Sequence, residues 1–318
     1  MDSWIGDVED PSWIEIGPDG GTLYAISELS PDGLVSALGL TPGKSTPGML
    51  NTVSTGAKPA HLAIHPDGRF LFTALYDGGG VAVHPIEPDG SVGPISDLHL
   101  HVRAAQADAV SHAHQVVIDP VGGDVLVVDL GTDSLHRYRL DPTTGRLTPS
   151  GRIRLAVDSG PRHLAFHPSG SYAYVADELD STVTVCERVD GVLRPGPVFP
   201  ALPEGFELSG RNYPGEILVS ADGRFVYVSN RGSNTIAVFA VGEDGRKPAD
   251  LALVAAPPSA GDWPRHLALD RTGRWLYCAN ERSGDLIWFP LEAATGVPGP
   301  PAGRLPVPGI AQFRISPR

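Results

Sequence analysis

The sequence predicts an all-β protein, a β-propeller whose blades are sheets of four antiparallel strands. The first observation is a repeat, in which an apolar strand opened by Pro or Gly is followed by a turn such as His65-Pro66-Asp67-Gly68 and then by an aromatic strand. The copies lie about 50 residues apart, a period typical of propeller blades and not of helical solenoids. In addition, no segment carries a sustained apolar stripe at helical spacing, so we expect almost no helix. The predicted blades start near residues 11, 59, 113, 161, 214 and 264.

The fourth repeat shows the expected order of strands most clearly. Its first strand covers 162–167 and its second covers 171–176, with Pro168-Ser169-Gly170 as the turn between them. The third strand covers 181–187 and ends before the turn Val189-Asp190-Gly191. Alternation of apolar and polar residues, β-branched side chains and turns rich in Gly, Asp and Pro are the signals of β-hairpins.

A single strand is predicted at 308–315, after the sixth repeat, and it has the pattern of the inner strand of a seventh blade. In a closed propeller the N-terminus usually completes the last blade and removes its exposed edge. Only about ten residues precede the first repeat. We therefore expect one seven-bladed propeller domain over 1–318, with the last blade incomplete because N-terminal strands are missing. The alternative is a last blade that is incomplete in itself.

Composition and charge narrow the classes of function. The formal net charge of −13 argues against general binding of nucleic acid or of anionic membranes. No apolar run approaches the length of a membrane span, and residues 1–7 lack the basic and apolar pattern of a signal peptide. The two cysteines, Cys186 and Cys278, lie in different repeats and indicate neither a disulfide nor a Cys-based metal site. We therefore expect a cytoplasmic protein.

Polar residues gather at one predicted mouth of the central channel. If the first strand of each blade lines the channel, its start and the end of the antiparallel second strand lie at the same mouth. First-strand starts supply Trp13, His61, His114, Arg162, His163, Glu216, Arg265 and His266. Second-strand ends supply Glu28, Tyr76, Leu130, Glu178, Arg231 and Glu281. A purely structural repeat needs only small or apolar residues at these positions, so three Arg, four His and four Glu predict a functional site.

Several of these residues also have a structural interpretation. Arg162 with Glu178 could be a buried ion pair between neighbouring strands, and Glu216 with Arg231 could be a second one. The histidines His61, His163 and His266 share one column of the repeat, and a repeated histidine is more often a hydrogen-bonding residue between blades than a catalyst. His112 and His114 could chelate a metal, but no carboxylate-rich group accompanies them. We predict a site without metal or cofactor.

Four motifs resemble those of a known family. They are His112-Ala113-His114-Gln115-Val116, the segment 160–168 around Pro161-Arg162-His163 with 177–183 after it, the segment 216–231, and Trp263-Pro264-Arg265. On these motifs the chain resembles the lactonase family of seven-bladed propellers, which includes propeller-type 6-phosphogluconolactonases and carboxy-muconate lactonising enzymes. The family's proposed catalytic positions correspond to His114, Arg162, Glu178 and Arg231, and the family works without a metal.

The resemblance implies a lactonase of carbohydrate metabolism that hydrolyses a sugar-acid lactone such as 6-phosphogluconolactone. Arginines suit an anionic substrate because their planar guanidinium groups bind carboxylate or phosphate. Glu178 would act as the base and His114 as the acid or oxyanion donor. His163, Glu216, Arg265 and His266 are the predicted substrate-binding residues. A muconate-type cyclising enzyme and a non-enzymatic binding propeller are the alternatives, although the few aromatics expected on the rim disfavour the latter.

Overall fold

The computed structural model describes residues 8–41, 46–101, 110–242 and 247–315. The described residues divide into two compact units, of which the first ends at residue 152 and the second comprises 153–315. Both consist of β-strands, and the only helix among the described residues is the short 3-10 helix η1 (Leu130–Thr132). None of the described residues forms a helix long and apolar enough to cross a membrane.

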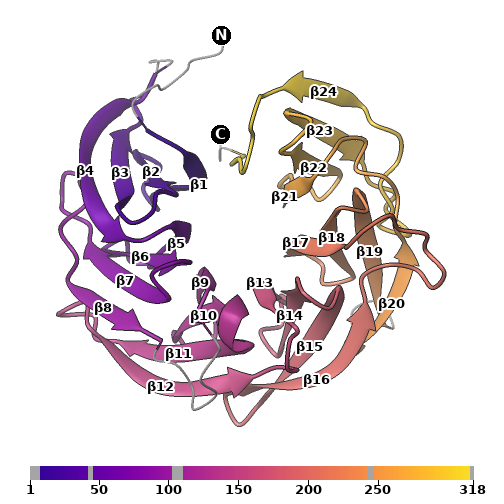
Figure 1. Ribbon diagram of the computed structural model, residues 1–318, viewed down its shortest axis with the longest axis horizontal. Helices are drawn as coiled ribbons and strands as arrows, with labels where there is room; N and C mark the ends of the chain where they lie inside the picture. Colours follow the sequence, from indigo (N-terminus) through magenta and orange to yellow (C-terminus); the bar gives the residue numbers. More distant parts are fainter. Residues whose placement is uncertain (1–7, 42–45, 102–109, 243–246, 316–318) are drawn as a thin grey trace. The chain divides into compact units, whose positions relative to one another are not determined.

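The first unit holds three antiparallel sheets of four strands, each built from strands consecutive in sequence (Figure 1). The first sheet is β1 (Pro11–Ile16), β2 (Thr22–Ser27), β3 (Gly33–Gly39) and β4 (Gly48–Gly56). The second is β5 (Pro59–Ile64), β6 (Phe70–Leu75), β7 (Gly80–Pro85) and β8 (Asp97–Leu100). The third is β9 (Ala113–Ile118), β10 (Val125–Asp129), β11 (Ser134–Leu140) and β12 (Leu147–Arg154), whose last residues extend past the boundary between the units.

The second unit repeats this arrangement three times (Figure 1). Its first sheet is β13 (Pro161–Phe166), β14 (Tyr172–Asp177), β15 (Thr182–Val189) and β16 (Val192–Pro200). The next is β17 (Tyr213–Val219), β18 (Phe225–Arg231), β19 (Thr235–Gly242) and β20 (Lys247–Ala255). The last is β21 (Pro264–Leu269), β22 (Trp275–Asn280), β23 (Asp285–Pro290) and β24 (Gly303–Pro306). The predicted repeat of four antiparallel strands is confirmed.

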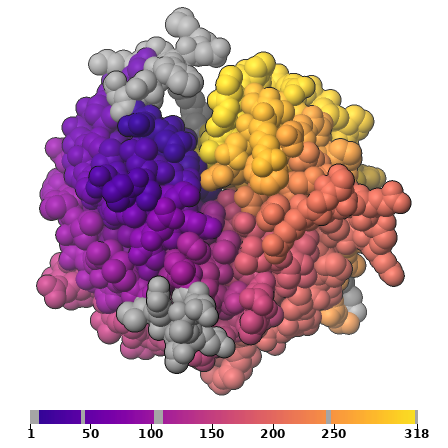
Figure 2. Space-filling view, viewed as in Figure 1, coloured from indigo at the N-terminus to yellow at the C-terminus, as the bar shows by residue number. Residues whose placement is uncertain are grey.

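The hydrophobic core lies between the faces of consecutive sheets within a unit. Between the first two sheets of the second unit, the side chains of Tyr174, Ile217, Val228 and Phe239 pack together out of contact with water. The phenol of Tyr174 donates a hydrogen bond to the Pro248 carbonyl at 2.9 Å, so this aromatic ring also joins two sheets. On the face drawn in Figure 2, the atoms of neighbouring sheets of one unit adjoin one another.

The first strands of consecutive sheets lie beside one another in each unit. β5 lies between β1 and β9, and β17 lies between β13 and β21. Side chains at the starts of β13, β17 and β21 can therefore meet, and these are the strands that carry most of the predicted site.

The predicted closing strand at 308–315 is wrong. Pro308 and Gly309 form a turn, and residues 310–315 have no strand structure. Instead, the ring of Phe313 packs edge-on against His266, with ring centres 5.0 Å apart. A strand needs a neighbouring strand to accept its backbone hydrogen bonds, and none of the described strands pairs with this segment. Whether the chain forms a single propeller domain remains a prediction.

Candidate active site

Three of the predicted site residues, His114, Arg162 and Arg265, occupy a β-bulge that recurs at the start of every first strand. In β13, Pro161 pairs with Asp177 and His163 pairs with Ala176, so Arg162 is the extra residue between them. The same shift makes Arg265 the extra residue in β21 and His114 the extra residue in β9. A bulge leaves one residue out of the ladder and redirects its side chain. The column of the repeat that holds His114, Arg162 and Arg265 is therefore a column of bulges, and His163 and His266 pair in register directly after it.

Glu178 lies between two arginines of the second unit. Its Oε2 atom is 2.6 Å from Nη2 of Arg231, the last residue of β18, and 3.3 Å from Nε of Arg162. Glu178 follows β14 directly, and its backbone N–H donates to the Gly160 carbonyl, which fixes it beside the start of β13. The structure thus brings together three of the four predicted catalytic residues.

Arg162 is buried, with 2% of its surface exposed. Burial and the charge of Arg231 lower the pKa of the guanidinium to about 9, although Glu178 opposes the shift. Its Nε and Nη1 atoms are buried and have no hydrogen-bond acceptor among the described residues. Leaving charged donors unsatisfied is costly, and a bound anion would supply the missing acceptors.

Arg231 is held in place by the backbone of the adjacent strand. Its Nε donates to the Tyr213 carbonyl and its Nη2 to the Pro214 carbonyl, each at 3.1 Å. There is room for the Arg231 side chain because the residue after Pro214 is a glycine. A Cβ atom at Gly215 would lie 3.3 Å from Arg231 Nε and 2.8 Å from Ser229 Oγ. Sequence reasoning missed the role of Gly215, and the available signal was a glycine in the column that carries Arg162 and Arg265.

Glu216 forms a second buried group with two histidines. Its Oε1 is hydrogen-bonded to Nδ1 of His163 at 3.0 Å, and its Oε2 lies 3.4 Å from Nε2 of His266. The suggested pair of Glu216 with Arg231 is not formed, because Arg231 binds Glu178 instead. The repeated histidines at these two positions therefore join neighbouring sheets, as their structural interpretation predicted.

Electrostatics keep both histidines of this group neutral. Burial and the positive charges of Arg162, Arg231 and Arg265 hold the pKa of His163 well below its usual range. Burial lowers the pKa of His266 to about 4, against the opposing charge of Glu216. Burial also raises the pKa of the Glu216 carboxyl, although His266 and Arg162 offset part of that rise.

Arg265 lies at the edge of this group and is partly exposed. Its Nη1 is 3.4 Å from Oε1 of Glu281, the residue that follows β22. Two cationic positions, those of Arg162 and Arg265, thus flank the Glu216 group in the second unit.

His114 belongs to the first unit, which is described by itself, and its place in one site with Arg162 remains a prediction. It is buried in β9, and its ring lies edge-on to that of Tyr76, with ring centres 5.8 Å apart. His112 stacks on the same tyrosine at 4.4 Å and is hydrogen-bonded through Nδ1 to the Tyr76 carbonyl. His61 in turn packs on Trp13, with ring centres 4.0 Å apart.

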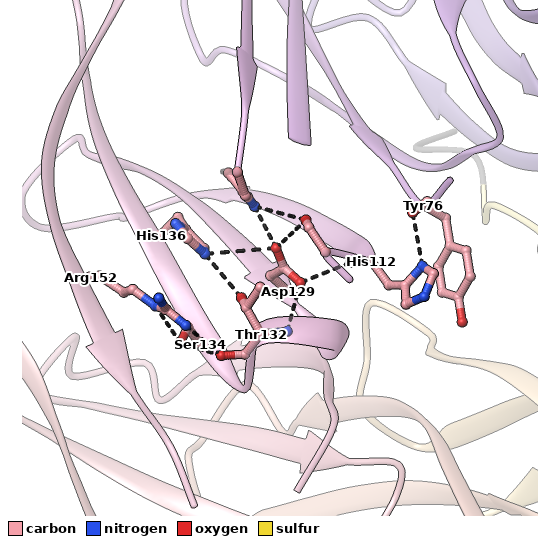
Figure 3. Close-up of polar contacts among 9 residues, drawn as sticks. Tyr76, His112, Asp129, Thr132, Ser134, His136 and Arg152 are labelled. Atoms are coloured by element: carbon pink, nitrogen blue, oxygen red, sulfur yellow. Dashed lines mark hydrogen bonds and ion pairs between the residues drawn. The ribbon is translucent and has the colours of Figure 1, made fainter. Parts of the chain in front are cut away.

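A buried cluster around Asp129 in the first unit was not anticipated from the sequence (Figure 3). Asp129 Oδ2 is hydrogen-bonded to His101 Nδ1 at 2.5 Å and to Ser111 Oγ at 2.6 Å. Its Oδ1 accepts hydrogen bonds from the backbone N–H groups of His112 and Thr132, so the carboxylate holds η1 in place.

His101, Asp129 and His136 present three potential metal ligands within 4.8 Å of one another. However, the rings of His101 and His136 are stacked face to face, 3.6 Å apart and inclined by only 9°. An imidazole binds a metal through a lone pair in the plane of its ring, and one ion cannot lie in the planes of two stacked rings. The arrangement is that of a structural hydrogen-bonding cluster.

Repeated sheets of four antiparallel strands with a polar cluster at the starts of their first strands define a β-propeller protein with an enzyme-like site. Residues 2–314 match the family described as "Lactonase, 7-bladed beta-propeller". The chain belongs to this lactonase family. The described residues form six four-stranded sheets.

Relatives and solved structures agree with this assignment. The chain is 34% identical over 291 residues to a 6-phosphogluconolactonase of Bacillus subtilis, covering 90% of this chain and 81% of the relative. It is 34% identical over 248 residues to that of Pectobacterium carotovorum, covering 76% of this chain and 70% of the relative.

Two solved structures are similar over nearly the whole chain. The periplasmic gluconolactonase PpgL of Pseudomonas aeruginosa has a TM-score of 0.88 at 28% identity, covering 98% of this chain and 89% of that protein. A putative 6-phosphogluconolactonase of Bacteroides fragilis has a TM-score of 0.86 at 30% identity, covering 97% and 87%. The predicted fold class and enzyme class are confirmed, and the chain is a lactonase similar to 6-phosphogluconolactonases.

Proposed function

We propose that the chain hydrolyses a sugar-acid lactone that carries an anionic group, of the 6-phosphogluconolactone type. The observation that carries this proposal is the buried guanidinium of Arg162, which has donors without acceptors beside Arg231 and Glu178. In a chain with a net charge of −13, such a cationic group is suited to a small anionic ligand. The activity named for the relatives supports the same substrate class.

The reaction adds water to the lactone carbonyl and opens the ring. Glu178 accepts a proton from the attacking water, which forms a bond to the carbonyl carbon. Negative charge develops on the carbonyl oxygen, where the guanidinium groups of Arg162 and Arg231 can stabilise it. The ring C–O bond then breaks, and the leaving oxygen takes a proton to give a hydroxy acid. We assign that proton to His114.

The remaining residues bind and orient the substrate. Arg265 is partly exposed and adds a cationic contact for the substrate. The buried group of His163, Glu216 and His266 joins the neighbouring first strands, and so it fixes the strand starts that carry Arg162 and Arg265. These roles form part of the proposal.

Glu178→Gln and Arg162→Ala test this assignment in a lactone hydrolysis assay. Substrates are δ-gluconolactone with and without a 6-phosphate, with spontaneous hydrolysis subtracted. We expect Glu178→Gln to lower kcat by about 100-fold or more, because a positioned base contributes about that factor. Arg162→Ala should lower kcat/KM on both substrates because it removes the guanidinium beside the carboxylate.

The matched control is Glu187→Gln, which changes an exposed glutamate of the neighbouring strand β15 and should leave the rates unchanged. Equal rates for the wild type and both site variants would rule out these roles for Glu178 and Arg162. If the wild type hydrolyses no lactone, the proposed function itself is wrong.

A further inference from the structure

Arg231 connects Glu178 to a second group of side chains, which we call the Trp263 rim and which consists of Tyr213, Trp263 and Arg282. The guanidinium carbon of Arg231 lies 5.7 Å from the centre of the Trp263 ring. Arg282 stacks on the same ring at 3.4 Å, and the ring of Tyr213 lies 5.8 Å away. One guanidinium thus contacts both Glu178 and the rim, so a single small ligand can reach the two groups together.

The backbone of Trp263 is held in an unusual conformation. Its φ is +67°, in the left-handed region that a bulky aromatic residue rarely adopts. Two hydrogen bonds maintain it: the Trp263 N–H donates to Asn234 Oδ1 at 2.9 Å, and its carbonyl accepts from the Glu281 N–H at 3.0 Å. Backbone strain that the surrounding structure maintains in this way is concentrated at functional sites.

The rim presents polar hydrogens that no group in the described part of the chain accepts. Among the described residues, the guanidinium of Arg282, the indole N–H of Trp263 and the hydroxyl of Tyr213 have no hydrogen bond or ion pair. The Arg282 side chain is exposed, and Trp263 and Tyr213 are partly exposed, so a ligand can reach them. By contrast, Arg231 and Arg265 each have a carboxylate partner.

We propose that the Trp263 rim is the phosphate-binding subsite of the enzyme, with Arg282 as the main ligand of the phosphate. The inference rests on the proposed function, since it assumes that Glu178 acts on the lactone carbonyl at the other end of the same molecule. A planar guanidinium donates two parallel hydrogen bonds to a phosphate, and stacking on Trp263 orients it beforehand. The rim therefore selects the phosphorylated lactone over the unphosphorylated one.

The test compares phosphorylated and unphosphorylated ligands in Arg282→Ala. Hydrolysis of δ-gluconolactone and of its 6-phosphate gives one ratio of kcat/KM values, and calorimetric binding of gluconate and 6-phosphogluconate gives a second, independent ratio. We expect Arg282→Ala to lower the preference for the phosphorylated ligand about tenfold in both measurements, as loss of one charge-assisted contact would. Arg271→Ala, an exposed arginine in the turn between β21 and β22, is the control and should leave both ratios unchanged.

Trp263→Gly provides a second variant whose backbone is not strained. Glycine adopts positive φ readily, so this change removes the ring while relieving the backbone. The same loss of phosphate preference is expected, with a thermal unfolding midpoint no lower than that of the wild type.

The outcomes separate this inference from the proposed function. If the wild type prefers the phosphorylated ligands and Arg282→Ala retains that preference, the subsite assignment is wrong and the lactonase proposal stands. The subsite assignment is also wrong if Arg282→Ala weakens both ligands equally, or if the wild type has no preference for the phosphorylated ligand. If the wild type hydrolyses no lactone but Arg282→Ala selectively weakens 6-phosphogluconate binding, the phosphate subsite stands and the proposed reaction does not.

Discussion

Gly215 occupies the bulge position at which the neighbouring first strands carry Arg162 and Arg265. Other repeats carry a side chain at this position, but at residue 215 a side chain would displace neighbouring atoms. A Cβ atom would lie 2.8 Å from Ser229 Oγ and 3.3 Å from Arg231 Nε, closer than neighbouring atoms normally approach. The missing side chain is therefore what allows Arg231 to lie along the start of β17 and reach Glu178.

Gly215→Ala tests this role at the level of one methyl group. We expect the methyl to displace Arg231 from Glu178 and to lower kcat/KM at least about tenfold, in keeping with the cost of misplacing a site residue. Overpacking should also reduce the free energy of unfolding by about 1–3 kcal/mol. Gly48→Ala is the control, since a Cβ there has no atom within 4 Å. Wild-type activity in Gly215→Ala would show that Arg231 can reach Glu178 without the space left by the missing side chain at residue 215.

At the scale of the element, one position of the second strand pairs with the residue just before the bulge of the first strand, and in four sheets it is Asp129, Asp177, Asn230 and Asn280. The two asparagines donate to the carbonyls of preceding segments, Asn230 to Ala201 at 2.8 Å and Asn280 to Ser259 at 3.3 Å. An ionised aspartate cannot donate a hydrogen bond. The two aspartates at this position differ in the number of hydrogen bonds they accept. Asp129 accepts four hydrogen bonds, whereas Asp177 accepts from Thr182 and Thr184 through one oxygen only.

The two carboxyls therefore titrate in opposite directions. Burial raises the pKa of Asp177 to about 8, despite the hydrogen bonds from the two threonines. For Asp129, burial is outweighed by the hydrogen bond and charge of His101 and by the hydrogen bonds from Ser111 and the His112 amide, so its pKa falls to about 2. The raised pKa of Asp177 gives stability that is complete below pH 4 and lost as the pH rises through 8. The lowered pKa of Asp129 gives stability that is present above pH 4 and lost as the pH falls through 2.

Asp177→Asn and Asp129→Asn form a matched pair for urea unfolding at several pH values. Relative to the wild type, Asp177→Asn should gain stability by up to about 1.4 kcal/mol per pH unit between pH 4 and 8. Asp129→Asn should lose about 2 kcal/mol or more at pH 7, because it removes hydrogen bonds to a charged acceptor, and this loss should shrink below pH 4. Two variants with the same pH dependence would contradict the assigned ionisation states.

At the scale of the whole molecule, the two cysteines bear on its redox chemistry. Cys186 and Cys278 are free and have no exposed surface, and burial raises the pKa of each thiol. A buried thiol with a raised pKa is a poor nucleophile. The cytoplasmic location remains a prediction, and one similar structure is of a periplasmic enzyme.

Thiol labelling reports unfolding of the second unit, which contains both cysteines. In native buffer, we expect labelling at least about 1,000-fold slower than in denaturant, because it requires opening of a sheet. Cys186→Ala and Cys278→Ala should label at similar native rates if the sheets of this unit unfold together, and a reductant should leave the unfolding midpoint unchanged. Fast native labelling of either cysteine would contradict its burial.

The sequence by itself determined the repeat of four strands, the strand starts and the residues at the ends of those strands. These features depend on the alternation of side chains and on turn residues within a few positions, so a short segment of sequence is enough to predict them. For the same reason the columns holding Arg162, Glu178, Arg231 and Glu216 could be predicted as a polar site.

The sequence suggested the pair of Arg162 with Glu178, which the structure contains, but only the tertiary structure decided the other partners. Glu178 and Arg231 are 53 positions apart, and Glu216 faces His163 and His266 from neighbouring sheets. Which carboxylate meets which cation depends on the bulges and on the space left by Gly215. An alignment of the repeats contains the glycine, but it shows neither the bulges nor the side chain that fills this space. The expected strand at 308–315 failed for a related reason: its pattern is local, but a strand exists only where another strand pairs with it.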